Sequence, residues 1–315
     1  MATADYHSSA DLKGVAFGGY INEDVMQQII RVLDVNRPFS ESIGSDSVSN
    51  SYTEWPKKKY NAPNLVNRVV DGQDATTYNV LTGERVGNHC QISRKVIAVT
   101  TRARNSDVIG VSDEYAEQLM VQTEQLMRDV EAISLSSQGS QADNGDAVPG
   151  IAGGFAAWVE TAYNSLTDGV AGGFANGTVS APTFGTTQAA LTEESIRSTC
   201  QTIYEQGFDP SILMCRPTVQ RRISEYMFTD AARIGIQQTD TKENNNVAVG
   251  AVKIFITDFD VDLVFTPNRL MPALDAPTTE NADAVYIYDP QYWRHGYLHN
   301  YRTEPLAKIG LSDRA

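Results

Sequence analysis

The sequence has few cysteines, and their arrangement would not stabilise a fold. Only Cys90, Cys200 and Cys215 occur among 315 residues, and no two of them form a Cys-x-x-Cys pair. An odd, scattered set predicts free thiols in a protein that folds in a reducing compartment. A chain of this length can bury a core without disulfides or metals. We therefore expect two domains, or one large and lobed domain.

Long apolar runs are also missing. No stretch approaches the roughly 18 apolar residues that a membrane-spanning helix needs. Met1 is followed by Ala-Thr-Ala-Asp-Tyr-His, without the basic and apolar regions of a signal peptide. We expect a soluble, cytosolic protein that does not contact a membrane.

Basic residues are scarce. The chain has 25 Lys and Arg against 39 Asp and Glu, a formal net charge of −14. Binding of nucleic acid depends on basic side chains that neutralise phosphates, so the composition argues against a nucleic-acid-binding protein. Solubility is the simplest explanation of the acidic surplus.

Catalytic motifs are absent as well. The sequence contains no P-loop, nucleophile elbow, zinc-protease or EF-hand pattern. His295 and His299 could share one helical face, but no third metal ligand is evident, so we expect them to pack in a core or an interface. We predict no enzyme, no catalytic residues, no cofactor and no metal.

One acidic cluster leaves a catalytic alternative open. Asp258, Asp260 and Asp262 alternate in sequence, so in an extended chain their carboxylates would share one face. Such a face could bind calcium, or act as an acid and base in a metal-dependent hydrolase. A solvated face is the other interpretation.

The most distinctive region is residues 51–106. It is rich in Val, Thr, Tyr, Asn and Arg, with turn signals at Asp71-Gly72 and Thr82-Gly83. The return run, Arg85 to Arg104, predicts a strand of roughly 65 Å, whereas the radius of gyration of such a chain is only about 20 Å. Either this hairpin projects and is covered by a neighbour, because a lone hairpin is marginally stable, or it folds back into a sheet of its own subunit.

The charge of this region favours contact with a neighbour. Residues 51–106 carry nine basic and four acidic side chains, a net charge of +5, which leaves −19 on the remainder. A basic hairpin on an acidic body suits docking onto another copy, although a solvated hairpin is the simpler alternative. The candidate contact residues are Lys57, Lys58, Lys59, Arg68, Arg85, Arg94, Lys95, Arg102 and Arg104.

The clearest helix is predicted from Ser112, as N-cap, to about Leu135. About 24 residues give a rod of roughly 36 Å, which indicates a scaffold helix. Its expected apolar stripe contains Leu119, Leu126, Val130 and Ile133.

The remaining segments predict mixed helices and strands. We expect a short helix over residues 25–33, a loop over 36–50, and a long, irregular surface connection over 137–188. A helix capped by Thr192 should stop at Gly207, and Pro217 should open another. Strands are expected at 212–215, at 253–266 around a turn near Phe259, and at 284–288. The fold class is therefore α+β.

Several short stretches, taken in order, resemble the major head (capsid) proteins of tailed bacteriophages, specifically the SU-ten-type family. No single stretch is specific, but the colinear set covers most of residues 36–311, with the Gly-rich middle as a gap. Ile309-Gly310-Leu311 departs from the expected Thr-Gly-Asp. The matching stretches are Arg37-Pro38-Phe39 to Ile43-Gly44, Tyr52 to Trp55, Val69 to Ala75, Arg85 to Ile92, Val96 to Thr101, Thr257-Asp258-Phe259, Pro267 to Pro272, and Glu304 to Lys308.

This resemblance implies the Hong Kong 97-type capsid fold. Its parts would be an N-terminal arm (1–50), an extended hairpin loop (51–106), a peripheral domain with the long spine helix (107–139), a mainly axial domain (140–250) and a return to the peripheral domain (251–315). It also implies a subunit that assembles with itself, as hexamers and pentamers, into an icosahedral or prolate head.

The expected location is the virion, after assembly in the host cytoplasm. The head would enclose double-stranded DNA without sequence-specific binding, and scaffolding, portal and decoration proteins are further candidate partners. Another virion structural protein, from the tail or the capsid decoration, is the alternative function.

Overall fold

The computed structural model describes residues 36–75, 78–145, 147–161, 169–184, 191–227, 254–259, 261–271, 283–308 and 310–314. The chain divides into two compact units. The large unit contains Val35–Arg94 and Gln125–Arg302, and the small unit contains Lys95–Glu124 and Thr303–Ala315, together with Met1–Asp34. The helix predicted over residues 25–33 lies outside the described residues. Within the described part, no helix has both the length and the apolar character needed to cross a membrane.

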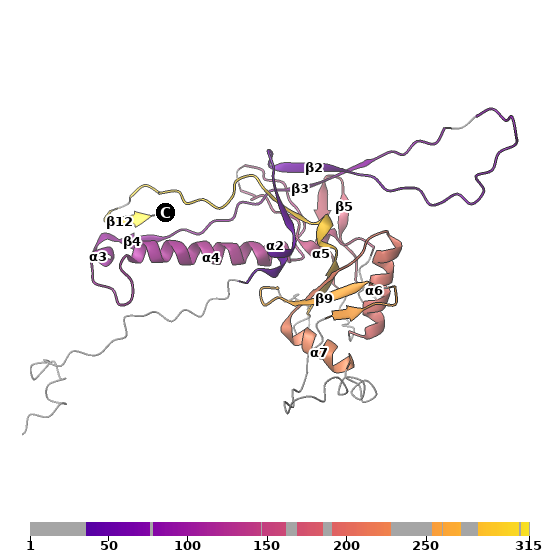
Figure 1. Cartoon of the computed structure of the whole chain (residues 1–315). Helices are drawn as coiled ribbons and strands as arrows, with labels where there is room; N and C mark the ends of the chain where they lie inside the picture. The colour runs from indigo at the N-terminus through magenta and orange to yellow at the C-terminus, as the bar shows by residue number, and fades with distance from the viewer. Residues whose placement is uncertain are drawn as a thin grey trace, which may run out of the picture. The chain divides into compact units, whose positions relative to one another are not determined.

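A four-stranded sheet forms the centre of the large unit (Figure 1). Its strand order is β10 (Val285–Tyr288), β7 (Ile212–Cys215), β9 (Asp262–Pro267) and β8 (Ile254–Ile256). β7 and β9 run parallel, whereas both outer strands are antiparallel to their neighbours. Together with its helices, this mixed sheet confirms the predicted combination of α and β structure.

Two helices cover one face of this sheet. Ile196 and Cys200 of α6 (Glu193–Glu205) and Ile223 of α7 (Pro217–Met227) pack in one cluster with Leu213 and Cys215 of β7. Successive strand residues point to opposite faces, so Leu213 and Cys215 face these helices while Met214 faces the other way. Figure 1 shows α6 and α7 beside β9.

The opposite face carries an aromatic core. Phe39 of α2 (Pro38–Ser42) and Phe155 of α5 (Phe155–Trp158) pack there with Met214, Tyr286 and Tyr288. The rings of Phe39 and Phe155 meet edge to face, with centroids 5.9 Å apart. The aromatic side chains of this face therefore join α2 and α5 to β10.

Residues 36–50 are not the loop that was predicted. They form α2 and then β1 (Gly44–Ser47). β1 pairs in parallel with β11 (Arg294–Tyr297), the strand that follows the short helix η2 (Pro290–Tyr292). The partners of this segment come from distant parts of the sequence, so its several serines, together with Pro38 and Gly44, were misleading.

The expectation of a surface connection over residues 137–188 is also partly wrong. Phe155, Ala156 and Ala157 are buried, and Val179 of β6 (Thr178–Ser180) is 1% exposed. β6 pairs with β5 (Gly173–Ala175) across a tight turn in which Asn176 and Gly177 have φ values of 53° and 84°. An Asn-Gly pair is the preferred sequence for such a two-residue hairpin turn.

The predicted scaffold helix is α4 (Glu114–Ser134), 21 residues or about 31 Å long. Its first-turn acceptor is Asp113 and not Ser112, because the Tyr115 N–H donates to the Asp113 carboxylate. The predicted stripe of Leu119, Leu126, Val130 and Ile133 is only half-buried. The fully buried residue of this helix is Glu131.

Local signals located the other elements well. Thr192 caps α6 in a capping box, and Gly207 follows the helix with φ +90°. α7 begins at Pro217, and β7 and β10 lie where strands were predicted. β8 and β9 flank a turn at residues 258–259.

The long return strand predicted for Arg85 to Arg104 is wrong. β3 (Glu84–His89) ends after six residues, and β4 (Ala98–Thr100) belongs to the small unit. There β4 pairs with the C-terminal β12 (Ser312–Arg314). The Thr100 side chain then accepts a hydrogen bond from Ala103 N–H, which starts the short helix α3 (Thr101–Arg104).

Candidate assembly surface

A two-stranded ladder forms the base of a hairpin. β2 (Tyr52–Lys57) pairs with β3 in antiparallel register, from Tyr52 opposite His89 to Lys57 opposite Glu84. A Cβ atom at Gly87 would lie 2.9 Å from the Thr53 carbonyl oxygen and 2.6 Å from the Tyr52 hydroxyl oxygen, so a larger residue here would force the ladder to shift. The ladder ends at the Lys57–Glu84 pair.

Aromatic stacking fixes this base to the large unit. The rings of Trp55 and Trp158 are 5.4 Å apart, and Trp158 also stacks on Phe174 at 6.2 Å. The Asn88 side-chain oxygen accepts from Gly153 N–H at 2.9 Å, and its amide nitrogen donates to the Gly153 carbonyl at 3.4 Å. The base is therefore held by its own subunit.

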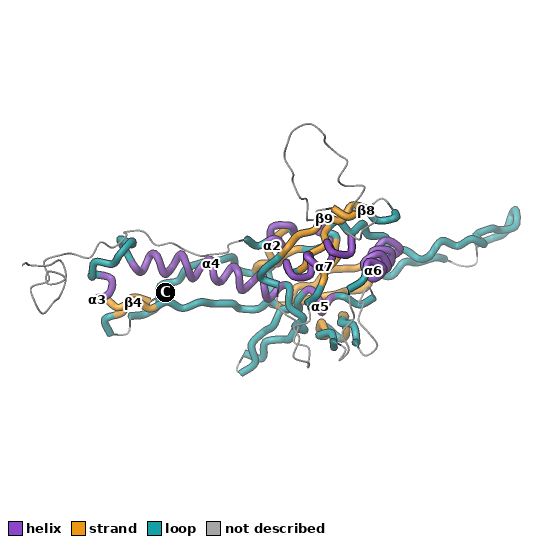
Figure 2. The backbone as a smooth tube through the Cα atoms, turned by 90° about the horizontal axis from the view of Figure 1, so that it is seen from below, coloured by secondary structure: helices purple, strands orange, loops and turns teal. Residues whose placement is uncertain are grey.

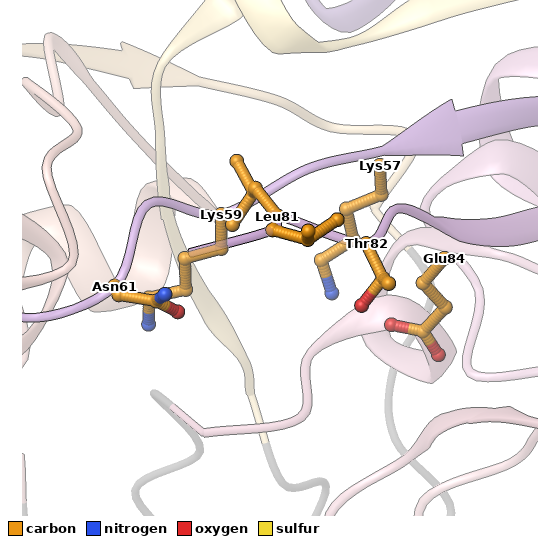
Figure 3. A pocket seen from close by; sticks show the side chains of 7 residues that line it. Lys57, Lys59, Asn61, Leu81, Thr82 and Glu84 are labelled. Carbon is orange, nitrogen blue, oxygen red and sulfur yellow. The ribbon is translucent and has the colours of Figure 1, made fainter. Parts of the chain in front are cut away.

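Beyond Lys57 and Glu84 the two arms of the hairpin separate. A gap of about 270 Å³ opens between them (Figure 3). Figure 3 shows Lys57, Lys59 and Asn61 on one chain and Leu81, Thr82 and Glu84 on the other. The Lys59 ammonium donates to the side-chain oxygen of Gln206 at 2.5 Å. Polar side chains line the gap on the side of Lys57 and Lys59, and no strand pairing crosses it.

We call residues 58–83 the hairpin loop; its described parts, 58–75 and 78–83, form a wide and mostly exposed loop (Figures 1 and 2). A turn occurs at Asp71-Gly72, as predicted, but not at Thr82-Gly83. Seven large apolar side chains in this loop are 65–95% exposed. They are Tyr60, Leu65, Val66, Val69, Val70, Tyr78 and Val80.

The structure separates the nine basic residues that were predicted to lie on one hairpin. Lys57, Lys58, Lys59, Arg68 and Arg85 are on β2, the hairpin loop or β3. Arg94 follows the ladder, Lys95 belongs to the small unit, and Arg102 and Arg104 are in α3. Residues 52–89 contain five basic and four acidic side chains, so their net charge is only +1.

Arg85 and Arg104 make ion pairs inside the subunit. Arg85 pairs with Glu54 across the ladder. Arg104 contacts Asp113 at 2.9 Å and Asp313 at 3.0 Å, and its guanidinium lies 5.3 Å from the Tyr115 ring centroid. Hydrogen bonding to Arg104 lowers the pKa of Asp113, while Lys308 first and Arg104 second lower the pKa of Asp313.

Glu131 is a buried contact that sequence reasoning missed. Its carboxylate accepts hydrogen bonds from Phe39 N–H at 2.8 Å, Ser40 N–H at 2.9 Å and the Asn268 amide at 2.9 Å. The Ser40 hydroxyl also donates to it. α2 has no side-chain cap of its own, so this distant carboxylate satisfies its first N–H groups. A lone Glu in an amphipathic helix gave no signal of this role.

His295 lies beside this cluster, in a strand and not on the helix that would have aligned it with His299. Its Nε2 is 3.3 Å from the Ser40 hydroxyl, and burial lowers its pKa although Glu131 acts in the opposite direction. Because Ser40 directs its proton to Glu131, the trio lacks the serine–histidine–carboxylate order of a hydrolase. Nearby, burial raises the pKa of Tyr288 to about 12.

The positions of Asp258 and Asp262 do not support the alternative of a metal-dependent hydrolase. Asp258 lies in the turn after β8, whereas Asp262 begins β9, so the two do not alternate along one strand. Asp258 instead lies 3.6 Å from Arg197, and Asp260 is outside the described residues. Among the residues that the structure describes, no group of three or more His, Cys, Asp and Glu side chains could hold a metal ion.

Comparison with known proteins gives one family and one fold. The family model described as SU10 major capsid protein matches residues 6–315. A protein of Mycobacterium phage Bobi is similar in structure, with TM-score 0.58 and 10% identity over 98% of this chain and 90% of that chain. A chain from the capsid structure of Cyanophage P-SCSP1u has TM-score 0.52 and 11% identity over 99% of this chain and 92% of that chain.

A third similar chain comes from the capsid of a native GTA particle, with TM-score 0.53 and 13% identity over 98% of this chain and 94% of that chain. At such identities these likenesses establish a shared fold of mixed helices and strands. The search of curated proteins found no match.

Proposed function

The chain belongs to the SU10 major capsid protein family, and on this premise we propose how its structure serves a phage head. Its function is that of a structural protein of the virion, a major capsid protein. The proposal concerns the way in which copies assemble. The supporting observation is the hairpin, whose base is fixed to the subunit while its loop is exposed.

We propose that the fold is of the Hong Kong 97 type. On this proposal α4 is the spine helix of the peripheral domain, and residues 140–250 fall mainly in the axial domain. Residues 1–50 act as the N-terminal arm, and the return to the peripheral domain occupies 251–315. The extended loop was first predicted over residues 51–106, and we propose that it comprises the shorter segment of β2, the hairpin loop and β3.

In the proposed assembly each subunit lays its hairpin loop over a neighbouring copy. The contact is heterologous, because the loop of one copy meets a different surface of the next, and such contacts close into rings when the rotation permits. Lys57, Lys58 and Lys59 stand at the base of the loop, where Lys57 and Lys58 face the neighbour and Lys59 contacts Gln206 of its own subunit. Rings of six and five subunits then complete an icosahedral or prolate shell.

The acidic charge of the subunit suits a container for DNA. A net charge of −14 disfavours adhesion of packaged double-stranded DNA to the shell. The enclosed DNA is thus held without sequence-specific binding. Assembly takes place in the host cytoplasm, with scaffolding, portal and decoration proteins as partners, and the subunit has no catalytic activity.

Electron microscopy of the expressed, purified chain tests this function. Closed shells, or the rings of five and six from which shells are built, are the expected result. Tubes would indicate a tail protein, and isolated trimers that bind only to preformed heads would indicate a decoration protein. Either of these results would overturn the capsid assignment.

A further inference from the structure

We propose that the hairpin loop holds the neighbouring copy by apolar contact, and that charge attraction has a minor part. This inference rests on the proposed function and names the chemistry of its contact. The partner is a second copy of this chain, and the surface that receives the loop must be apolar.

The first support is the concentration of exposed apolar side chains. Leu65 is 95% exposed, and Val69 and Val70 are 81% and 73% exposed. The seven side chains come from only 21 residues, Tyr60 to Val80. Single exposed apolar side chains are normal on soluble proteins, whereas a concentration of them in one segment points to an interaction site.

The second support is the charge of the same stretch. Residues 60–83 contain Arg68, Asp71 and Asp74, a net charge of −1. The other four basic residues of the hairpin lie at its base, where Arg85 already pairs with Glu54 and Lys59 already contacts Gln206. The exposed end of the hairpin therefore carries no excess of positive charge with which to attract an acidic body.

The third support is the shape of the loop end. Gln73 N–H donates to the Val70 carbonyl, the Gln73 side chain accepts from Val70 N–H, and Gly72 has φ +78°. These two hydrogen bonds close the turn on itself while Val69 and Val70 stay exposed. A turn that pairs the backbone N–H and C=O of Val70 within itself lets Val69 and Val70 meet an apolar surface at a lower desolvation cost, with Asp71 left at the solvated edge.

A second copy is the partner that this charge pattern fits. Two copies with a net charge of −14 each repel one another, and that repulsion is weakest where the approaching segment is nearly neutral. Residues 52–89 carry a net charge of +1 and residues 60–83 a net charge of −1, so the hairpin can approach another acidic copy at low electrostatic cost. The lysines at its base offset repulsion but do not supply the main attraction.

Two sets of variants separate the two forces. One replaces the apolar end (Leu65→Ser, Val69→Ser and Val70→Ser), and the other removes the lysine charges (Lys57→Gln, Lys58→Gln and Lys59→Gln). Leu311→Ser is the matched control, because Leu311 is 82% exposed but lies in the small unit. All of these side chains are exposed, so the thermal unfolding midpoint of the isolated subunit should not move.

The measurement is the subunit concentration at which half of the protein sediments as shells or rings, determined over a range of sodium chloride and ammonium sulfate concentrations. The apolar-end variant should raise it at least about tenfold, and the lysine variant by less than about threefold. Salt should not weaken wild-type assembly, and ammonium sulfate should strengthen it, because excluded salts favour apolar burial.

The opposite pattern overturns the inference. Loss of assembly in the lysine variant, wild-type shells that dissociate as sodium chloride rises, and normal assembly of the apolar-end variant would show that charge holds the loop. That result would leave the proposed capsid function intact. If both variants assemble normally, and a third subunit without the hairpin loop also assembles normally, the proposed docking role itself is contradicted.

Discussion

The central sheet and the hairpin loop use the same kinds of side chain in opposite surroundings. Leu213 and Met214 of β7 are completely buried, between helices on one face and aromatic rings on the other. Leu65 and Val69, in the same large unit, are almost fully exposed. The sheet residues therefore stabilise one subunit, whereas the loop residues are available to stabilise an assembly of subunits.

The largest expected effect comes from exchanging a leucine in each region for alanine. Leu213→Ala should lower the free energy of unfolding by about 2–5 kcal/mol, because it leaves a cavity in the core. Leu65→Ala should change it by less than about 0.5 kcal/mol and should weaken assembly instead. Denaturant titration of the isolated subunit measures the first effect, and sedimentation of assembled protein measures the second. Equal destabilisation by both changes would erase the contrast between the regions.

A buried polar contact extends the contrast to charged groups. Glu131→Gln keeps the shape of the side chain but points an amide NH2 group at donors from Phe39, Ser40 or Asn268. We expect a loss of about 2–4 kcal/mol of stability. Glu194→Gln makes the same chemical change at an exposed position of α6 and should have almost no effect. A small effect at both positions would mean that Glu131 is not needed to hold α2 on α4.

The hairpin base should respond at an intermediate level. Trp158→Ala removes the ring that lies between Trp55 and Phe174, at an expected cost of roughly 1–2 kcal/mol. Hydrogen exchange should become faster in β2 and β3 but not in β7. Tyr204→Ala, which removes an exposed stack with Phe259, serves as the control and should leave exchange in β2 unchanged. Unaltered exchange in the Trp158 variant would show that the base is held by other contacts.

The smallest effect concerns acid and the small unit. The pKa values of Asp113 and Asp313 are lowered by their basic partners, so these ion pairs contribute stability above the ordinary carboxyl pKa of about 4. That contribution is lost as pH falls through the lowered values. Hydrogen exchange in β4 and β12 should increase in this acidic range, and Arg104→Gln should weaken the pH dependence. An equal response in the hairpin loop would not fit this assignment.

Sequence reasoning succeeded where the signal is local. The caps of α6, the proline that opens α7 and the β-branched or apolar runs of β7 and β10 each act within a few residues. Such signals work because capping and turn formation involve neighbouring groups in the chain. The membership of the capsid family was likewise recognisable, since it depends on the order of short stretches.

Reasoning from sequence failed where the partner is distant. α2 begins where it does because Glu131, 92 positions away from Phe39, accepts its N–H groups. The strand predicted to end at Arg104 is interrupted because β4 pairs with the C-terminal β12. That interruption moved four basic residues off the hairpin, so the charge contrast inferred from residues 51–106 does not describe the hairpin itself. Whether the nine basic residues contact a neighbour remains a prediction.

Removal of the hairpin loop tests the account most directly. An Asn-Gly turn joining Lys57 to Glu84 would replace residues 58–83 and keep the β2–β3 ladder and its aromatic anchor. The shortened subunit should unfold at the wild-type temperature, within a few degrees, and should remain unassembled at concentrations where the wild-type protein forms shells. Shells of normal size and yield from this subunit would contradict the claim that the loop joins one copy to the next.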